Sequence, residues 1–321
     1  MLPTLEEIEN AAQTVYGSMT PTPQYRWPLL CDRRDAVLWI KHENHTPVGA
    51  FKVRGGLVYF SKLSRESAKT NGVICATRGN HGQSVAFAAA QYGIHTTVVV
   101  PHGNSKEKNA AMASFGAQLI EHGDDFQSSL EYARDLADDR GLHMVPSFGR
   151  DLVAGVSTYS LELFRAVEDL ARVYVPIGLG SGICGMLAAR AALGLSTEVI
   201  GVVSSHARAY AESFDQKKAV SAPVQTRLAD GMACRVPNDD ALALILEGVN
   251  RVVEVTDQEV AEAMRTLFEC THNVSEGAGA APLAAAIQER TLNRGARIAV
   301  VLSGGNIDRD VFARVLSGGA E

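Results

Sequence analysis

Short runs of β-branched residues alternate with longer Ala-rich or amphipathic stretches, and this alternation limits the possible folds more than any other feature of the chain. The predicted strands occupy residues 37–43, 73–77, 96–101, 117–122, 172–178, 198–204, 251–255 and 297–304. Helical patterns lie between them, for example at 81–93, 128–139, 261–272 and 277–290. Nearly continuous apolar strands that alternate with helices predict an α/β fold, with parallel sheets covered by helices on both faces.

Composition narrows the class of protein. The 321 residues are 46% hydrophobic, enough to bury the core of one large or two modest domains. The net charge is −6 and no basic stripe is interleaved with aromatic residues, which argues against nucleic acid as the main partner. No signal-peptide pattern and no apolar run of roughly 20 residues is present, so we expect no membrane association. The five cysteines form no CxxC pair and predict reduced thiols in a cytoplasmic protein.

The loops that follow strands are where site residues are expected, because ligands of parallel sheets bind beyond the carboxyl ends of the strands. After the strand at 37–43 comes GAFKVRGG, in which Lys52 stands between an apolar residue and glycines. A lysine can form a Schiff base with an aldehyde cofactor if desolvation or a nearby cation lowers its pKa. We expect Phe51 to supply the desolvation and Arg54 the cation. The alternative is an ordinary exposed lysine.

A second loop, ATRGNHGQS, follows the strand at 73–77 and leads into an Ala-rich helix. The backbone N–H groups at the start of such a helix can hold a carboxylate. Asn80 can both donate and accept hydrogen bonds, which suits the phenolic oxygen of a cofactor ring. The alternative is that Asn80 is simply the N-cap of the helix.

A third loop joins the strand at 172–178 to a helix through a glycine-rich turn whose N–H groups can bind a phosphate. Its residues are Gly178, Leu179, Gly180, Ser181 and Gly182. With Gly185, the glycines also fit GxGxxG, and a dinucleotide site then expects an acidic residue about 20 positions later. The next strand ends without an acid, but Arg208 could accept a 2′-phosphate, so an NADP-dependent enzyme remains an alternative.

A fourth loop, VVLSGGNID, closes the last predicted strand. Ser303 could donate to a heteroaromatic nitrogen while the two following glycines leave room for a ring; the alternative is a plain turn. His42 and His45 flank Glu43 without forming HExxH, so a metal site there has little support. No GxSxG motif is present, so a serine hydrolase has little support either.

Taken in order, these stretches resemble the fold-type-II pyridoxal-phosphate enzymes, and within them the threonine/serine dehydratase and serine racemase group. The resemblance extends through MTPTP, KHENHTPVGAFKVRGG, GNHGQ, DLVAGVSTYSLE, LADGMACR, SEGAGAAPLAA and SGGN. It implies that pyridoxal 5′-phosphate is attached to Lys52 next to Phe51, with Asn80 on the ring hydroxyl, the glycine loop on the phosphate and Ser303 on the pyridine nitrogen. The substrate carboxylate would lie at the start of the second loop's helix, at Thr77, Arg78, Gly79 and His81.

The resemblance also implies a tryptophan synthase β-like architecture of two α/β domains with the cofactor in the cleft between them. The small domain would comprise residues 46–148, inserted into a large domain of residues 1–45 and 149–321, and a homodimer is the usual assembly. The implied reaction is removal of water and ammonia from a 2-amino-3-hydroxy acid, with Lys52 as the general base. A racemase, a β-replacement enzyme and a non-catalytic ligand-binding protein remain alternatives.

Three departures from the group's pattern bear on the substrate and on metals. Arg78 stands where racemases carry a serine, and because arginine stays protonated it cannot accept a proton but can bind a carboxylate. Val156-Ser157 replaces a common Gln-Gly, and we expect it to add bulk beside the substrate. Both departures argue against plain threonine or serine as the preferred substrate, so the candidates are a threonine/serine-like and a bulkier or acidic 3-hydroxy amino acid. Val203, Ala207 and Ala209 replace the acidic ligands of metal-activated relatives, so we expect no metal.

Overall fold

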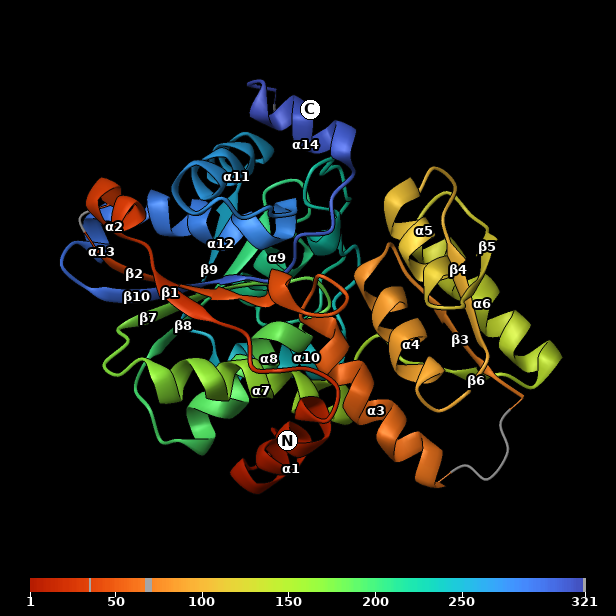
Figure 1. The fold of residues 1–321 in the computed structure, drawn as a ribbon. Helices are drawn as coiled ribbons and strands as arrows, with labels where there is room; N and C mark the ends of the chain where they lie inside the picture. The colour runs from red at the N-terminus through yellow and green to blue at the C-terminus, as the bar shows by residue number, and fades with distance from the viewer. Residues whose placement is uncertain (35, 67–70, 320–321) are drawn as a thin grey trace.

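The computed structural model describes residues 1–34, 36–66 and 71–319, which form two sheets (Figure 1). The larger sheet runs in the order β1 (Gln24–Arg26), β2 (Val37–His42), β10 (Arg297–Leu302), β7 (Arg172–Pro176), β8 (Glu198–Ser204) and β9 (Arg251–Val255). The smaller sheet runs in the order β5 (Gln118–Glu121), β4 (Thr96–Val100), β3 (Val73–Ala76) and β6 (His143–Met144). Every pairing is parallel except that of β1 with β2, which confirms the predicted parallel-rich α/β fold.

Helices cover both sheets (Figure 1). They are α1 (Leu5–Tyr16), α2 (Pro28–Arg34), α3 (Lys52–Glu66), α4 (Asn80–Ala90), α5 (Lys106–Ser114), α6 (Phe126–Arg140), α7 (Arg150–Ala166), α8 (Ser181–Ala192), α9 (Ala209–Gln216), α10 (Asp239–Gly248), α11 (Asp257–Thr271), α12 (Gly277–Gln288), α13 (Arg290–Asn293) and α14 (Arg309–Leu316), with short 3₁₀ turns η1 (Glu43–His45) and η2 (Asp230–Met232). The smaller sheet and helices α4, α5 and α6 form the lobe on the right of Figure 1.

The central strand β10 explains why the strands of this chain are almost continuously apolar. Ile298 and Val300 pack into a core that includes residues of α11 and α12. Ala299 and Val301 point to the other face and pack into a core that includes residues of α7 and α8. Since both faces of the sheet are covered, alternation of apolar and polar residues is lost.

Helices α3 and α7 cross with their backbones in close contact. This crossing fixes the position of the first turn of α3. A Cβ on Gly155 would lie 2.2 Å from the Arg54 carbonyl oxygen and 2.8 Å from the Cα of Gly55. No larger residue fits there without moving a backbone. The α3 helix begins at Lys52, so the crossing also holds the predicted Schiff-base lysine in place.

Two strands were not predicted from the sequence. Strand β1 has three residues and lies antiparallel at the sheet edge, and β6 has only two residues. Runs this short carry no usable periodicity. In the described ranges of the chain, no helix is long and apolar enough to cross a membrane.

Candidate active site

One cavity of about 490 Å³ contains all the predicted site residues. They are Phe51, Lys52, Thr77, Arg78, Gly79, Asn80, His81, Gly178, Leu179, Gly180, Ser181, Gly182 and Ser303. These residues come from four loops separated by up to about 250 positions, but each loop follows the carboxyl end of a strand: β2, β3, β7 or β10. The cavity has the size expected for a small-molecule site.

Lys52 lies in the cavity with its ammonium 4.9 Å from the centre of the Phe51 ring. Burial lowers the pKa of Lys52 to about 8, while the negative charge of Glu276 opposes the shift. The prediction that desolvation lowers this pKa is therefore confirmed. A substantial fraction of the amine is neutral near pH 8, as a Schiff-base nucleophile and general base require.

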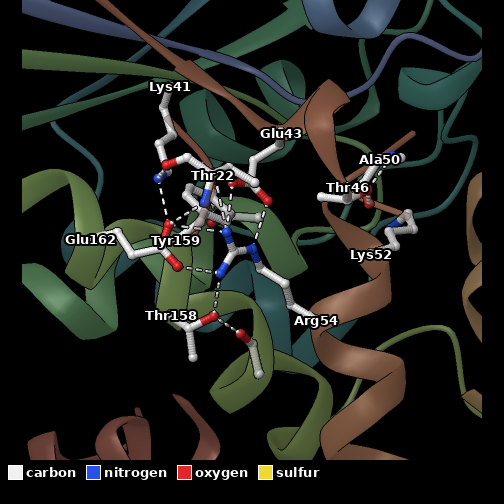
Figure 2. A network of polar contacts seen from close by, with 12 residues as sticks. Thr22, Lys41, Glu43, Thr46, Ala50, Lys52, Arg54, Thr158, Tyr159 and Glu162 are labelled. Carbon is white, nitrogen blue, oxygen red and sulfur yellow. Dashed lines mark hydrogen bonds and ion pairs between the residues drawn. The ribbon is translucent and has the colours of Figure 1, made fainter. Parts of the chain in front are cut away.

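The prediction that Arg54 lowers the Lys52 pKa is wrong. Figure 2 shows the Arg54 side chain extending from α3 toward Glu43 and Glu162, in a buried polar cluster. Its guanidinium binds Glu43 through Nε and Nη2 at 2.7 and 3.0 Å, and Glu162 through Nη1 and Nη2 at 2.6 and 3.1 Å. Residues two apart on a helix point to nearly opposite sides, so Arg54 anchors α3 instead of facing the cavity.

Helix α4 opens onto the cavity, and Gly79 is its N-cap, so the alternative of Asn80 as N-cap is wrong. Gly79 has φ of 154°, which favours glycine, and a Cβ would lie 2.4 Å from the Lys108 side chain. Thr77 Oγ1 accepts hydrogen bonds from the Gly79 and Gly82 N–H groups at 2.9 and 3.3 Å. Thr77 thus satisfies the Gly82 N–H, while the N–H groups of Asn80 and His81, at the first two positions of α4, have no intrahelical acceptor and suit an anion.

The Asn80 amide is held in one orientation by two neighbours. Its Nδ2 donates to Glu276 Oε1 at 2.7 Å, and its Oδ1 accepts from Asn306 Nδ2 at 2.9 Å. A primary amide has two N–H groups, so one donor of Asn80 remains for a ligand. This donor fits the ring hydroxyl that the sequence assigns to it.

A buried charge cluster that the sequence analysis missed lies next to Asn80. Lys108 Nζ is 2.7 Å from Asp230 Oδ2 and 3.4 Å from Glu276 Oε2. Burial raises the pKa of Glu276, and the charge of Lys108 opposes the shift. Burial lowers the pKa of Lys108, but Asp230 and Glu276 outweigh it and keep the pKa above its ordinary value. Glu276 and Asp230 lie in the quoted SEGAG and LADG stretches, yet no local pattern assigned them to the site.

Two positions of the glycine turn between β7 and α8, Gly178 and Gly180, do not accommodate a larger residue. A Cβ on Gly178 would lie 2.4 Å from the Gly231 carbonyl oxygen, and Gly180 has φ of 102°. A glycine-rich turn at a helix N-terminus, where backbone N–H groups are accessible, fits a phosphate. Glycine is needed at position 185 for a different reason. This residue lies inside α8, where an added Cβ would be 3.0 Å from the Ser157 nitrogen of α7. The GxGxxG match therefore reflects helix packing at its third glycine.

Arg208 is not available for a 2′-phosphate. Its guanidinium hydrogen bonds to Glu254 at 2.6 and 3.1 Å and forms an ion pair with Glu212 at 3.3 Å. The NADP alternative, which required Arg208 to bind the 2′-phosphate, is therefore wrong about this residue.

Ser303 ends β10 with 3% of its surface exposed, and its carbonyl oxygen accepts the Phe51 N–H at 3.0 Å. Its hydroxyl has no hydrogen-bond partner within the described ranges, so it can donate to a ring nitrogen in the cavity. Lys52, Asn80, the glycine turn and Ser303 thus offer the four kinds of contact that pyridoxal phosphate needs.

Three other side chains bear on the predicted substrate site. Val156 and Ser157 are buried in α7 against α8 and do not line the cavity, so the expectation that they add bulk beside the substrate is wrong. His81 does line the cavity, and its Nε2 is buried without a partner in the described structure. Burial, with the charge of Lys52, lowers the pKa of His81 to about 3, so its imidazole is neutral. Within the described ranges, no group of three or more His, Cys, Asp or Glu side chains is placed to hold a metal ion.

Comparisons with known proteins agree with this site. A family model described as pyridoxal-phosphate dependent enzyme matches residues 15–304. The L-threonine ammonia-lyase of Geobacter sulfurreducens is 36% identical over 283 residues, which are 88% of this chain and 70% of that protein. The L-threo-3-hydroxyaspartate ammonia-lyase of Saccharomyces cerevisiae is 30% identical over 319 residues, which are 99% of this chain and 98% of that protein.

Solved structures agree as well. The T.th. threonine deaminase has a TM-score of 0.87 at 30% identity, covering 95% of this chain and 99% of that one. A pyridoxal 5′-phosphate-dependent aspartate racemase has a TM-score of 0.90 at 26% identity, covering 96% of this chain and 97% of that one. The fold-type-II prediction is confirmed, and the chain belongs to the pyridoxal-phosphate-dependent enzymes, within their ammonia-lyase (dehydratase) group.

Proposed function

We propose that this enzyme converts a 2-amino-3-hydroxy acid into a 2-oxo acid and ammonia. The observation that carries the proposal is Lys52, whose pKa is lowered to about 8 inside a cavity that also offers a phosphate turn, a ring-nitrogen donor and a carboxylate receptor. The names of the relatives, threonine and 3-hydroxyaspartate ammonia-lyases, support the reaction type.

The residues for holding the cofactor follow from the site. Gly178, Leu179, Gly180, Ser181 and Gly182 would bind the phosphate through backbone N–H groups. Ser303 would donate to the pyridine nitrogen, Asn80 to the ring hydroxyl, and Phe51 would pack beside the ring. When bound, pyridoxal phosphate withdraws electrons from the substrate Cα.

The chain itself supplies positioning and a base. The first turn of α4, with Thr77 beneath it, would hold the substrate α-carboxylate. The freed amine of Lys52 would then take the Cα proton. The 3-hydroxyl leaves as water, and hydrolysis of the remaining unsaturated amine takes up one water and releases ammonia.

Racemisation is less well supported than elimination. It requires a second group that gives and takes a proton on the opposite face of Cα. Arg78 stays protonated, and the lowered pKa of about 3 makes His81 a weak base. A non-catalytic binding protein would not need an amine with the pKa of Lys52 at this position.

We also propose a small domain of residues 46–148, inserted into a large one of residues 1–45 and 149–321. The strands of the smaller sheet fall between positions 73 and 144, and those of the larger sheet fall outside that range. The homodimer, the cytoplasmic location, the lack of a metal requirement and the lack of nucleic-acid and membrane partners remain predictions.

The test is covalent attachment of the cofactor. The purified protein should be yellow, and borohydride should bleach it and fix the cofactor to the peptide that contains Lys52. The variant Lys52→Ala should lose this label and nearly all 2-oxo acid production from a panel of 3-hydroxy amino acids. Lys62→Ala is the matched control, because Lys62 lies on the same helix with 53% of its side chain exposed. A label on another lysine, or a bound nicotinamide nucleotide in place of pyridoxal phosphate, would contradict the proposal.

A further inference from the structure

The cavity contains more anion receptors than a monocarboxylic substrate requires. The turn Gly178–Gly182 suits the cofactor phosphate, and the first turn of α4 suits an α-carboxylate. Arg78, which also lines the cavity, is a third receptor. If the proposed function holds, the first two receptors are occupied and Arg78 faces whatever remains of the substrate.

Within residues 1–34, 36–66 and 71–319, Arg78 has no partner that explains its position. Its Nε is buried and makes no hydrogen bond, and its guanidinium forms no ion pair, with any residue that the structure describes. A buried donor without an acceptor costs free energy. A ligand that brings an acceptor to Arg78 removes this cost.

The other strongly basic groups of the cavity are already engaged. Lys108 is paired with Asp230 and Glu276, at 2.7 and 3.4 Å. Arg235, at the cavity wall, is 3.0 Å from Asp125. Lys52 is reserved for the cofactor and the Cα proton. Among the described residues, Arg78 is therefore the lysine or arginine of this cavity that remains free for a second carboxylate.

We propose that Arg78 binds the distal carboxylate of the substrate, and that the preferred substrate is a 2-amino-3-hydroxydicarboxylic acid of the 3-hydroxyaspartate type. A guanidinium binds a carboxylate through two parallel hydrogen bonds, which fixes orientation as well as charge. The methyl group of threonine leaves the Arg78 donors unpaired, so the same residue attracts the dicarboxylate and disfavours threonine. The inference rests on the proposed function.

The experiment compares Arg78→Met, Arg78→Lys and wild type with both kinds of substrate. Arg78→Met removes the charge at similar length, and Arg78→Lys keeps the charge but loses the two-pronged geometry. Arg165→Met is the matched control, because Arg165 is half-exposed on α7, paired with Glu9, and outside the cavity. The assays are kcat/KM for 3-hydroxyaspartate and for threonine, and calorimetric binding of succinate and butyrate, which do not react. Thermal unfolding checks that each variant is folded.

We expect wild type to prefer 3-hydroxyaspartate to threonine and succinate to butyrate. Arg78→Met should lower kcat/KM for 3-hydroxyaspartate and the affinity for succinate by roughly 10- to 100-fold, with little loss for threonine and butyrate. For Arg78→Lys, kcat/KM for 3-hydroxyaspartate and the affinity for succinate should lie between the values for wild type and Arg78→Met. For Arg165→Met, both values should match those of wild type.

The outcomes separate this inference from the proposed function. Equal losses for threonine and 3-hydroxyaspartate would mean that Arg78 holds the α-carboxylate, which overturns the inference and leaves the function standing. A wild-type preference for threonine over 3-hydroxyaspartate would also overturn the inference and leave the proposed function standing. If no 3-hydroxy amino acid gives a 2-oxo acid while succinate binding still depends on Arg78, the dehydratase function fails and the carboxylate receptor stands.

Discussion

The chemistry of Lys52 depends on two opposing influences on its pKa. Burial in the cavity lowers the pKa to about 8, and the nearby negative charge of Glu276 raises it. Because kcat reports groups in the enzyme–substrate complex, it should rise with pH as the freed Lys52 amine loses its proton, and level off above the pKa. Burial has the larger effect on this pKa; Glu276, which opposes it, also accepts a hydrogen bond from the Asn80 amide.

Replacing Glu276 by Gln should move this pH profile. Gln keeps a hydrogen-bond acceptor for Asn80 but removes the negative charge that raises the Lys52 pKa, so the pKa falls further. The rising limb of log kcat against pH, with a slope of about one, should shift to lower pH. The matched control is Glu247→Gln, at an exposed position on α10. An unchanged profile, or one displaced to higher pH, would show that Glu276 does not act on Lys52 through its charge.

At the scale of elements, the position of Lys52 follows from how closely α3 crosses α7. Gly55 and Gly155 face each other, so the two backbones touch where larger residues would hold them apart. The buried pairs of Arg54 with Glu43 and Glu162 tie α3 to η1 and α7 (Figure 2). Helix packing and an ion cluster together hold the first residue of α3 at the cavity.

Substituting Gly155 with Ala should therefore disturb the site from a distance. The new Cβ would lie 2.2 Å from the Arg54 carbonyl oxygen, a clash that requires a backbone shift. We expect about 1–3 kcal/mol less stability in urea denaturation, together with weaker retention of the cofactor on gel filtration. Gly149→Ala, at the N-cap of the same helix where a Cβ meets only Pro146 at 3.9 Å, should cost about 1 kcal/mol or less. Equal effects of the two substitutions would argue against the crossing as the cause.

At the scale of the whole molecule, Lys108 links the two sheets across the cavity. It belongs to α5, beside the smaller sheet, and reaches Asp230 of η2 and Glu276 at the N-cap of α12. It is 6% exposed, so its charge is poorly screened by solvent. Its removal would leave two carboxylates close together without a compensating cation.

The variant Lys108→Met should be destabilised by about 3–5 kcal/mol near pH 8, because it removes one partner of a buried ion cluster. The loss should be smaller near pH 5. Glu276 has a raised pKa in the folded protein, so its destabilising effect is absent below the unfolded pKa and grows as the pH rises through the folded pKa. Without Lys108 this pKa is higher still. Urea denaturation at both pH values measures the difference.

The matched control is Lys62→Met, which removes an exposed pair with Asp151 and should cost about 1 kcal/mol or less at either pH. A loss for Lys108→Met that is the same at pH 5 and pH 8 would mean that Glu276 does not titrate in response.

The sequence by itself determined the parallel α/β fold and the strand-following loops, and it indicated the lysine that we propose to carry the cofactor. These features are local: apolar runs mark buried strands, and glycine turns mark places where backbone N–H groups are free to bind. Three of these loops meet because the carboxyl ends of the parallel strands β2, β10 and β7 lie at the same edge of the larger sheet. The fourth loop follows β3 of the smaller sheet, so its place at the cavity depends on how the two sheets pack. The group's order of motifs then identified the cofactor.

Only the tertiary structure decided which charges meet. Arg54 is two residues from Lys52 yet points away from it, because the helix turns its side chain toward Glu43 and Glu162. Glu276 is 224 positions from Lys52, yet its charge acts on the Lys52 pKa. Charge interactions depend on the distance between the groups and on their burial, and the local sequence around a residue gives neither. For the same reason, only the structure shows that Lys108 and Arg235 are paired with carboxylates, whereas the Arg78 guanidinium has no ion-pair partner among the residues described.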